Sequence, residues 1–560
     1  DSILPELKRN RIILYQGEEV EPFHKTFIEK YFNEEIFPFL QPMIIQKNGI
    51  HSFIQDGRIY LVISLRRKRK RKSTSQRPRY TYALMKIPYT RLPRFVELPT
   101  HNGFHYIMFI EDIIKANLQS VFPGYDIIDC YGIKISRDAD FSLENEDQKD
   151  IAEKILKKVR KRKIGAVTRF QYDRNMPPYF LKYLCDTYEI EEEELLPSGR
   201  YLNLAELAEL PNPVGEKLKR QLPDPLRVPI LETDNSILSV LHRQDVLLHF
   251  PYQSFDYVLR FLMQAAFDPK VVEIKVTQYR VAENSAVVNS LISAARNGKK
   301  VTVFVEMKAR FDEENNYVTA ELMQQAGIKI IYSLPGLKVH AKLAYVRMKS
   351  NDPEHPLKGY AYLSTGNFNE KTARIYSDKG LLTSHGDFIE DIDEIFHILE
   401  GKPHHREFKR LLVSQFNMLP AIQKMINREI DHVKNGGTGR IILKMNSLED
   451  KDMIDALYRA SEAGVKIDLI IRGICRLVPN QPYSENITVT RIVDAYLEHS
   501  RVWYFYNEGR EDVYLASADW MERNLRRRIE TAFPILSEPL KRQVIDILNL
   551  QLADNQSAAW

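Results

Sequence analysis

Hydrophobic and polar positions in the first two hundred residues follow both strand and helix periods. Apolar residues recur at helical spacing over 20–40, while residues 58–65 and 80–87 are nearly continuous apolar runs typical of strands. Residues 189–210 are acidic, and their apolar spacing predicts a surface helix. This mixture predicts an α+β head domain.

A second pattern begins after residues 210–229, where proline and charge indicate a domain boundary. From there strands and helices alternate, as in the strand–helix–strand unit of residues 271–307 and again in residues 440–473. In the first unit Ser285 is suited to cap the helix start and Gly298 its end. The predicted fold class is therefore α/β, with four parts: a 1–20 remnant of a preceding segment, a 21–226 head domain, and catalytic domains at 227–405 and 406–560.

The two α/β units match each other in order, with a separation that shrinks steadily along the chain. A chance match would not preserve this order, so we interpret the two units as a duplication with a ligand cleft between them. The matched pairs are Lys275 with Lys444, Gly298 with Gly464, Glu306 with Arg472, His340 with His499, Asn367 with Asp519, and Asp378 with Glu530.

Composition restricts the cellular compartment and the class of partner. The 80 Lys+Arg and 75 Asp+Glu residues leave a net charge of only +5, which does not by itself predict a polyanion partner. Three scattered cysteines indicate neither disulfides nor a zinc site and favour a reducing, cytoplasmic compartment. The sequence contains no apolar run of membrane-spanning length and starts without a signal peptide or a methionine, so we expect a fragment of a longer protein.

One segment is strongly basic. Most of residues 66–79 are Lys or Arg, and the segment lies between two predicted strands. The segment is interpreted as an exposed hairpin loop, either merely solvated or used to dock a polyanion.

The candidate chemistry centres on two histidines. His340 and Lys342 are two residues apart, so on a strand an imidazole and an ammonium would share one face. His499 and Arg501 repeat this spacing. Downstream carboxylates, Asp378 and Glu530, could each fix a histidine tautomer and leave its second nitrogen for attack or proton transfer.

Phosphate binding is suggested by neighbouring cations and donors. The Ser-Thr-Gly-Asn run ending at Asn367 offers amide donors for phosphate oxygens. Arginines near strand ends, or in the segments around the two histidines, would bind phosphate in bidentate fashion. Arg310 precedes acidic residues and could equally form a surface ion pair. The candidates are Arg280, Arg310, Arg472 and Arg528. Together these features predict phosphoryl transfer, with His340 as nucleophile and His499 holding the nucleotide or moving a proton.

The motifs also carry a family resemblance. The doubled His-x-Lys/Arg layout resembles the phospholipase D superfamily, and the whole chain resembles bacterial polyphosphate kinases. The segments that carry the narrower resemblance are DVLLHFPYQSF, TQYRVAENS, VEMKARFDEENN, GLKVHAKL, STGNFNEKTARIYSD and YLEHSRV.

This resemblance implies a specific activity. Members move the γ-phosphate of ATP reversibly onto inorganic polyphosphate through a phosphohistidine, which here would be His340. The resemblance assigns His499, Tyr376 and Arg472 to ATP and assigns Arg280 and Arg310 to a Mg²⁺ site, although guanidinium offers a metal no lone pair. It further implies ADP as product, a homo-oligomer and no nucleic-acid partner. It also allows peripheral association with the inner membrane face.

Two alternatives remain open. A phospholipase D-like phosphodiesterase would share the duplicated histidine, but Arg501 replaces the lysine expected there. A non-catalytic polyanion-binding protein would use the basic 66–79 loop and the scattered arginines.

Overall fold

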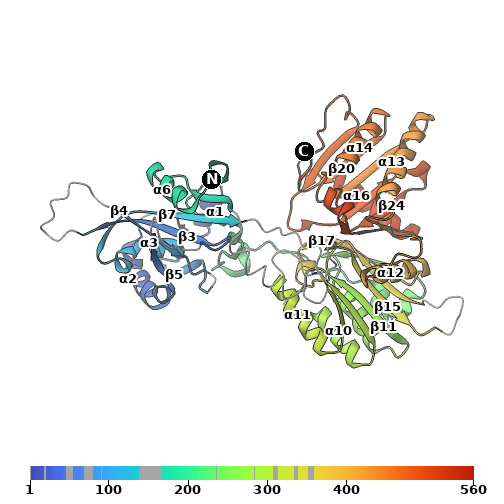
Figure 1. The fold of residues 1–560 in the computed structure, drawn as a ribbon, viewed down its shortest axis with the longest axis horizontal. Coiled ribbons are helices and arrows are strands. Elements are labelled where there is room, and N and C mark those ends of the chain that lie inside the picture. Colours follow the sequence, from blue (N-terminus) through green and yellow to red (C-terminus); the bar gives the residue numbers. More distant parts are fainter. Residues whose placement is uncertain are drawn as a thin grey trace. The chain divides into compact units, whose positions relative to one another are not determined.

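A computed structural model describes residues 2–17, 20–45, 54–68, 80–89, 91–137, 167–234, 236–282, 284–306, 313–332, 338–350 and 358–559. These residues form two compact units that divide between residues 221 and 222 (Figure 1). No helix in these ranges is long and apolar enough to cross a membrane.

The first unit is the mixed α+β head that the sequence predicted. Its larger sheet has the order β2-β4-β3-β7-β8-β9, and a smaller one has the order β1-β6-β5. A core that includes Phe32, Ile63 and Ile113 packs helices α2 and α3 against both sheets. The elements are α1 (Ile3–Arg9), β1 (Ile12–Tyr15), α2 (Pro22–Tyr31), β2 (Pro42–Ile44), β3 (Ile59–Arg67), β4 (Tyr80–Lys86), β5 (Phe95–His101), β6 (Phe104–Phe109), α3 (Ile110–Ala116), α4 (Leu118–Val121), β7 (Tyr125–Arg137), β8 (Val167–Asp173), α6 (Pro178–Tyr188) and β9 (Leu195–Ser198).

The helix predicted over residues 189–210 is wrong. The segment contains two short 3₁₀ turns, Glu192–Glu194 and Leu204–Glu209, separated by β9. Strand β9 pairs in parallel with β8, with Leu195 opposite Phe170. Pro197 and Gly199 interrupt any helix here, so pairing with an existing sheet is favoured over helical propensity.

The second unit begins with the first α/β repeat, drawn in green and yellow in Figure 1. Its sheet has the order β10-β17-β16-β15-β11-β12-β13. The strands are β10 (Val246–Phe250), β11 (Val271–Gln278), β12 (Lys300–Val305), β13 (Lys329–Tyr332), β14 (Lys338–Val339), β15 (Lys342–Met348), β16 (Lys358–Ser364) and β17 (Tyr376–Thr383). The helices are α7 (Pro229–Thr233), α8 (Ile237–Leu241), α9 (Asp256–Phe267), α10 (Ala286–Arg296), α11 (Glu313–Gln325) and α12 (Gly386–Leu399).

The second repeat, drawn in orange and red, has the same strand order: β18-β26-β24-β23-β19-β20-β21, extended by β27. Strands β11 and β19 hold the same central place, and each carries its matched lysine, Lys275 or Lys444. The strands are β18 (Leu412–Val413), β19 (Arg440–Met445), β20 (Lys466–Ile471), β21 (Ile487–Ile492), β22 (Leu497–Glu498), β23 (Arg501–Phe505), β24 (Asp512–Ala516), β25 (Arg528–Ile529), β26 (Thr531–Pro534) and β27 (Ala558–Ala559). The helices are α13 (Met418–Lys434), α14 (Lys451–Glu462), α15 (Glu522–Arg526) and α16 (Glu538–Leu552). The predicted duplication of the α/β fold is therefore confirmed.

The predicted helix caps are also in place. The Ser285 hydroxyl accepts a hydrogen bond from the Val288 amide at the start of α10. Gly298 follows the end of α10 with a φ of 80°, a left-handed conformation that glycine adopts without strain.

One hydrophobic cluster joins the two repeats, which also exchange short strands. Helices α12 and α16 contribute Phe396 and Val544 to a single hydrophobic cluster that includes residues of both sheets. Strand β14 of the first repeat pairs in parallel with β25 of the second, and β22 of the second pairs in parallel with β17 of the first. These reciprocal pairs bring the histidine segment of each repeat against the carboxylate segment of the other.

The predicted basic loop at 66–79 lies largely outside the described residues. Arg66 and Arg67 belong to the end of β3, and Arg66 forms an ion pair with Asp126.

Candidate active site

His340 lies directly after β14 and faces the second repeat. Its Nδ1 is 2.9 Å from Oε2 of Glu530, and both side chains are buried. Glu530 also accepts hydrogen bonds from Ser517 Oγ at 2.6 Å and Asn524 Nδ2 at 2.5 Å. The carboxylate is thereby fixed and fixes the imidazole in turn.

His499 lies directly after β22 and is held in the mirrored way. Its Nδ1 is 2.8 Å from Oδ2 of Asp378, which belongs to the first repeat. The Thr365 hydroxyl donates to the same carboxylate at 2.6 Å. Each histidine therefore takes its carboxylate from the opposite repeat.

Close backbone approach makes the Asp378 arrangement possible. A Cβ atom added at Gly366 would lie 2.3 Å from Oδ2 of Asp378. Only glycine leaves room for the carboxylate at this position.

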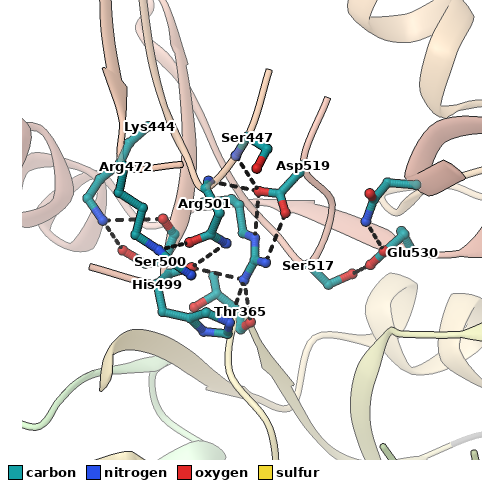
Figure 2. Close-up of polar contacts among 12 residues, drawn as sticks. Thr365, Lys444, Ser447, Arg472, His499, Ser500, Arg501, Ser517, Asp519 and Glu530 are labelled. Atoms are coloured by element: carbon teal, nitrogen blue, oxygen red, sulfur yellow. Dashed lines mark hydrogen bonds and ion pairs between the residues drawn. The ribbon is translucent and has the colours of Figure 1, made fainter. Parts of the chain in front are cut away.

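The residues around His340 form a first half-site, and those around His499 form a second. Arg501 occupies the centre of the second half-site (Figure 2). Its Nε and Nη2 each lie 3.2 Å from an oxygen of Asp519, and its Nη1 lies 3.2 Å from Nε2 of His499. Nη1 also donates to the His499 carbonyl at 2.9 Å. The backbone amide of Asn446 donates to Asp519 at 2.8 Å, so the carboxylate that orients Arg501 is itself held.

Lys342 lies near His340, although not for the predicted reason. His340 is in the connection between β14 and β15 rather than within one strand, so strand alternation does not apply. The buried Lys342 ammonium donates to the His340 carbonyl oxygen. It also lies 5.3 Å from the centre of the Tyr279 ring, which meets the His340 ring edge-on at 4.7 Å.

The residues predicted to bind nucleotide gather around the same two histidines. The Tyr376 ring is 5.2 Å from the His499 ring. Arg472 donates through Nε to Asn446 Oδ1, and the Asn446 amide donates to the His499 carbonyl at 3.4 Å. On the other side, Arg528 Nη1 is 3.9 Å from Oε1 of Glu530.

Asn367 lies in the turn after β16. Its side-chain oxygen is buried and has no hydrogen-bond partner among the described residues. Burying an amide oxygen without a partner is unfavourable, so this group is a candidate for contact with a ligand.

Burial and charge keep both histidines neutral. Burial lowers the pKa of His340 well below 6.5, and the nearby cations Lys342, Arg528 and Arg501 lower it further. Burial also lowers the pKa of His499, and the opposing effect of Asp378 does not restore it. Although burial alone would raise the pKa of Asp378, His499 and Thr365 bring that pKa below its usual value. The Asp378 carboxylate is therefore suited to accept from the neutral imidazole N–H of His499.

The assignment of Arg280 and Arg310 to a Mg²⁺ site stays a prediction. A guanidinium carries no free lone pair, so Arg280 cannot be a ligand, and Arg310 lies outside the described residues. Within the part of the chain that the structure describes, no group of three His, Cys, Asp or Glu residues could hold a metal ion. The described side chains therefore offer phosphate-binding cations rather than ligands for Mg²⁺.

Several site residues were not singled out from the sequence. Asp519 occupies the duplicate position of Asn367, and this match was the available signal for it. Tyr279 lies in the TQYRVAENS segment, but neither it nor Ser517 or Asn524 was assigned a role, and only the folded arrangement brings the three residues to the histidines.

Fold and site together define a duplicated α/β protein whose paired histidines are completed across the repeat boundary. Three family models match the chain: the polyphosphate kinase middle domain at residues 23–210, C-terminal domain 1 at 236–405 and C-terminal domain 2 at 411–560. The chain belongs to the polyphosphate kinase family.

Relatives and a solved structure agree with this assignment. The chain is 37% identical to a polyphosphate kinase of Vibrio cholerae over 100% of this chain and 79% of that protein. It is 36% identical to a polyphosphate kinase of Escherichia coli over 100% of this chain and 81% of that protein. The crystal structure of polyphosphate kinase from Porphyromonas gingivalis matches with a TM-score of 0.87 and 49% identity, covering 100% of this chain and 81% of that one.

Proposed function

We propose that this protein is a phosphotransferase that moves the γ-phosphate of ATP reversibly onto inorganic polyphosphate through a phosphohistidine at His340. Family membership gives the reaction class. The observation that carries the assignment of His340 is its neutral, buried imidazole, fixed at Nδ1 by Glu530.

The tautomer follows from this contact. The Glu530 carboxylate accepts from Nδ1–H, so the lone pair of His340 is on Nε2. No residue that the structure describes donates a hydrogen bond to that nitrogen, which leaves it available to attack phosphorus.

The phosphoryl group is then transferred in two steps. Nε2 of His340 forms an N–P bond to the γ-phosphorus while the bond to the bridging oxygen breaks, and ADP leaves with the electron pair. A terminal oxygen of polyphosphate then attacks the same phosphorus, and the N–P bond electrons return to Nε2. Lys342 and Arg528 lie on this side of the site and would offset the charge of the transferred group.

The second half-site is suited to hold the nucleotide. Tyr376 offers a ring beside His499, and Arg472 offers a guanidinium anchored by Asn446. The Asn367 side-chain N–H₂ would donate to a phosphate oxygen, and its buried Oδ1 would accept from a donor group of the ligand.

ATP in this reaction would bring Mg²⁺ bound to its own phosphates. The described residues supply no carboxylate or imidazole cluster for it, so we assign it no protein ligand set and no step. A homo-oligomer and peripheral membrane contact remain expectations from the family. The phospholipase D-like alternative has no support beyond fold, since the matching family models and curated relatives are polyphosphate kinases.

The test is labelling with γ-³²P-ATP followed by mapping of acid-labile phosphate. The wild-type protein should carry label at His340, and His340→Ala should carry none. His404→Ala is a matched control because His404 also pairs with a carboxylate, Glu394, at 2.9 Å outside this site, and it should keep the label. A folded wild-type protein that synthesises polyphosphate without ever labelling His340 would refute the proposal.

A further inference from the structure

The two half-sites differ at two duplicated positions. Lys342 of the first repeat corresponds to Arg501 of the second, and Asn367 corresponds to Asp519. The first repeat thus has a lysine and a neutral amide at the positions where the second has an arginine and a carboxylate.

This difference changes the group that contacts Nε2 of each histidine. Arg501 Nη1 lies 3.2 Å from Nε2 of His499, and Figure 2 shows the two side chains next to each other. A guanidinium can only donate, so Nε2 must accept, and the ring hydrogen must lie on Nδ1 and point to Asp378. Both nitrogens of His499 are therefore engaged.

Asp519 makes the contact persistent. It binds Arg501 through Nε and Nη2, which leaves Nη1 to point at His499. Although burial alone would lower it, the pKa of Arg501 is raised because Asp519 stabilises the cation. Burial would raise the pKa of Asp519, but Arg501 lowers it, so the pair stays charged.

The first half-site lacks this device. The Lys342 ammonium donates to the backbone oxygen of His340 instead of to its ring. Asn367 carries no charge with which to hold a cation in place.

We infer that Arg501, oriented by Asp519, masks the Nε2 lone pair of His499 and so confines the covalent intermediate to His340. This inference rests on the proposed function and makes Arg501 a positioning residue. Without the mask, Nε2 of His499 would form an N–P bond as His340 does, with the phosphoryl donor's leaving group departing with its electron pair. Nδ1–H would stay with Asp378.

The experiment rebuilds the first half-site in the second. In a His340→Ala background, Arg501→Lys is compared with the parent, and Arg501→Lys with Asp519→Asn restores the complete Lys/Asn pair. The second variant avoids an unpaired buried carboxylate if the first fails to fold. Each protein is treated with phosphoramidate, a small donor that needs no nucleotide site, and phosphohistidine is mapped by mass spectrometry.

We expect His499 to be phosphorylated at least roughly tenfold faster in the rebuilt variants than in His340→Ala alone, because a charge-assisted hydrogen bond to the lone pair is lost. The reciprocal swap, Lys342→Arg with Asn367→Asp, should lower phosphorylation of His340 by a similar factor. With His340 present, the rebuilt variants should carry phosphate at both histidines, whereas a purely structural role for Arg501 would leave the label on His340 alone.

The inference is overturned if the rebuilt variants melt like their parent and show no added phosphate at His499. It is also overturned if the folded reciprocal swap leaves His340 labelling unchanged. Failure of the proposed function would look different, as wild-type protein with no label from ATP, whereas the phosphoramidate comparison would still decide the role of Arg501.

Discussion

At the residue scale, the two carboxylates occupy equivalent positions but should not be equivalent in function. Glu530 fixes the proposed nucleophile, while Asp378 fixes the histidine that Arg501 masks. Glu530→Gln removes the charge from a hydrogen bond worth about 1.5–3 kcal/mol. Labelling of His340 in a single turnover should therefore slow by roughly tenfold to a hundredfold.

Asp378→Asn is the matched comparison. It should slow steady-state turnover while leaving the single-turnover rate of His340 labelling nearly intact. Equal loss of labelling in both variants would show that the division between the two half-sites is wrong.

The depressed pKa of His340 gives a second residue-scale prediction. An ordinary histidine gains a proton near pH 6.5 and loses its nucleophilic lone pair, but burial and the adjacent cations delay this event to lower pH. The ¹⁵N NMR signals of His340, assigned with His340→Ala, should remain those of a neutral imidazole from about pH 8 down to about pH 6. A midpoint inside that range would contradict the electrostatic account.

At the scale of elements, the turn between β16 and β17 depends on Gly366. Gly366→Ala places a methyl group against Asp378, which must move away from His499. We expect a loss of about 1–3 kcal/mol in unfolding free energy together with a large drop in turnover. Chemical denaturation and steady-state assays would measure both.

Gly386→Ala is the control for this change. Gly386 begins α12, and nothing lies within 4 Å of a Cβ placed there. Its substitution should leave activity unchanged and stability the same or slightly higher. Comparable losses at both glycines would point to backbone effects rather than to Asp378.

The helices and strands also show which features sequence patterns can predict. The strand at residues 271–277, in which apolar and polar residues alternate, and the capping positions Ser285 and Gly298 were predicted because these signals are local. Residues 189–210 were mispredicted because β9 is stabilised by pairing with β8, which no local pattern records. The duplication indicated both histidines and both carboxylates, but not which carboxylate meets which histidine.

At the scale of the molecule, the first unit has a hydrophobic core of its own, and in the second unit one cluster joins both repeats beside a cluster confined to the second repeat. Calorimetry should therefore resolve two unfolding transitions rather than three. Phe32→Ala removes a fully buried ring from the first unit, and Phe396→Ala removes one from the cluster that joins the two repeats of the second unit. Each should shift only its own transition, by about 3–5 kcal/mol.

Independent melting of the two repeats would contradict the role of the cluster that joins them. So would a single transition that both substitutions shift equally.

The reciprocal strand pairs have a consequence for ancestry. Because β14 meets β25 and β22 meets β17, a lone repeat would leave its histidine without a carboxylate. A single-repeat ancestor could have completed the site only by meeting a second copy of itself about a two-fold axis. In such a homodimer both histidines would have been identical by symmetry. In one continuous chain the two copies can differ, and Arg501 and Asp519, at the positions of Lys342 and Asn367, are differences that a symmetric homodimer could not hold on one side only.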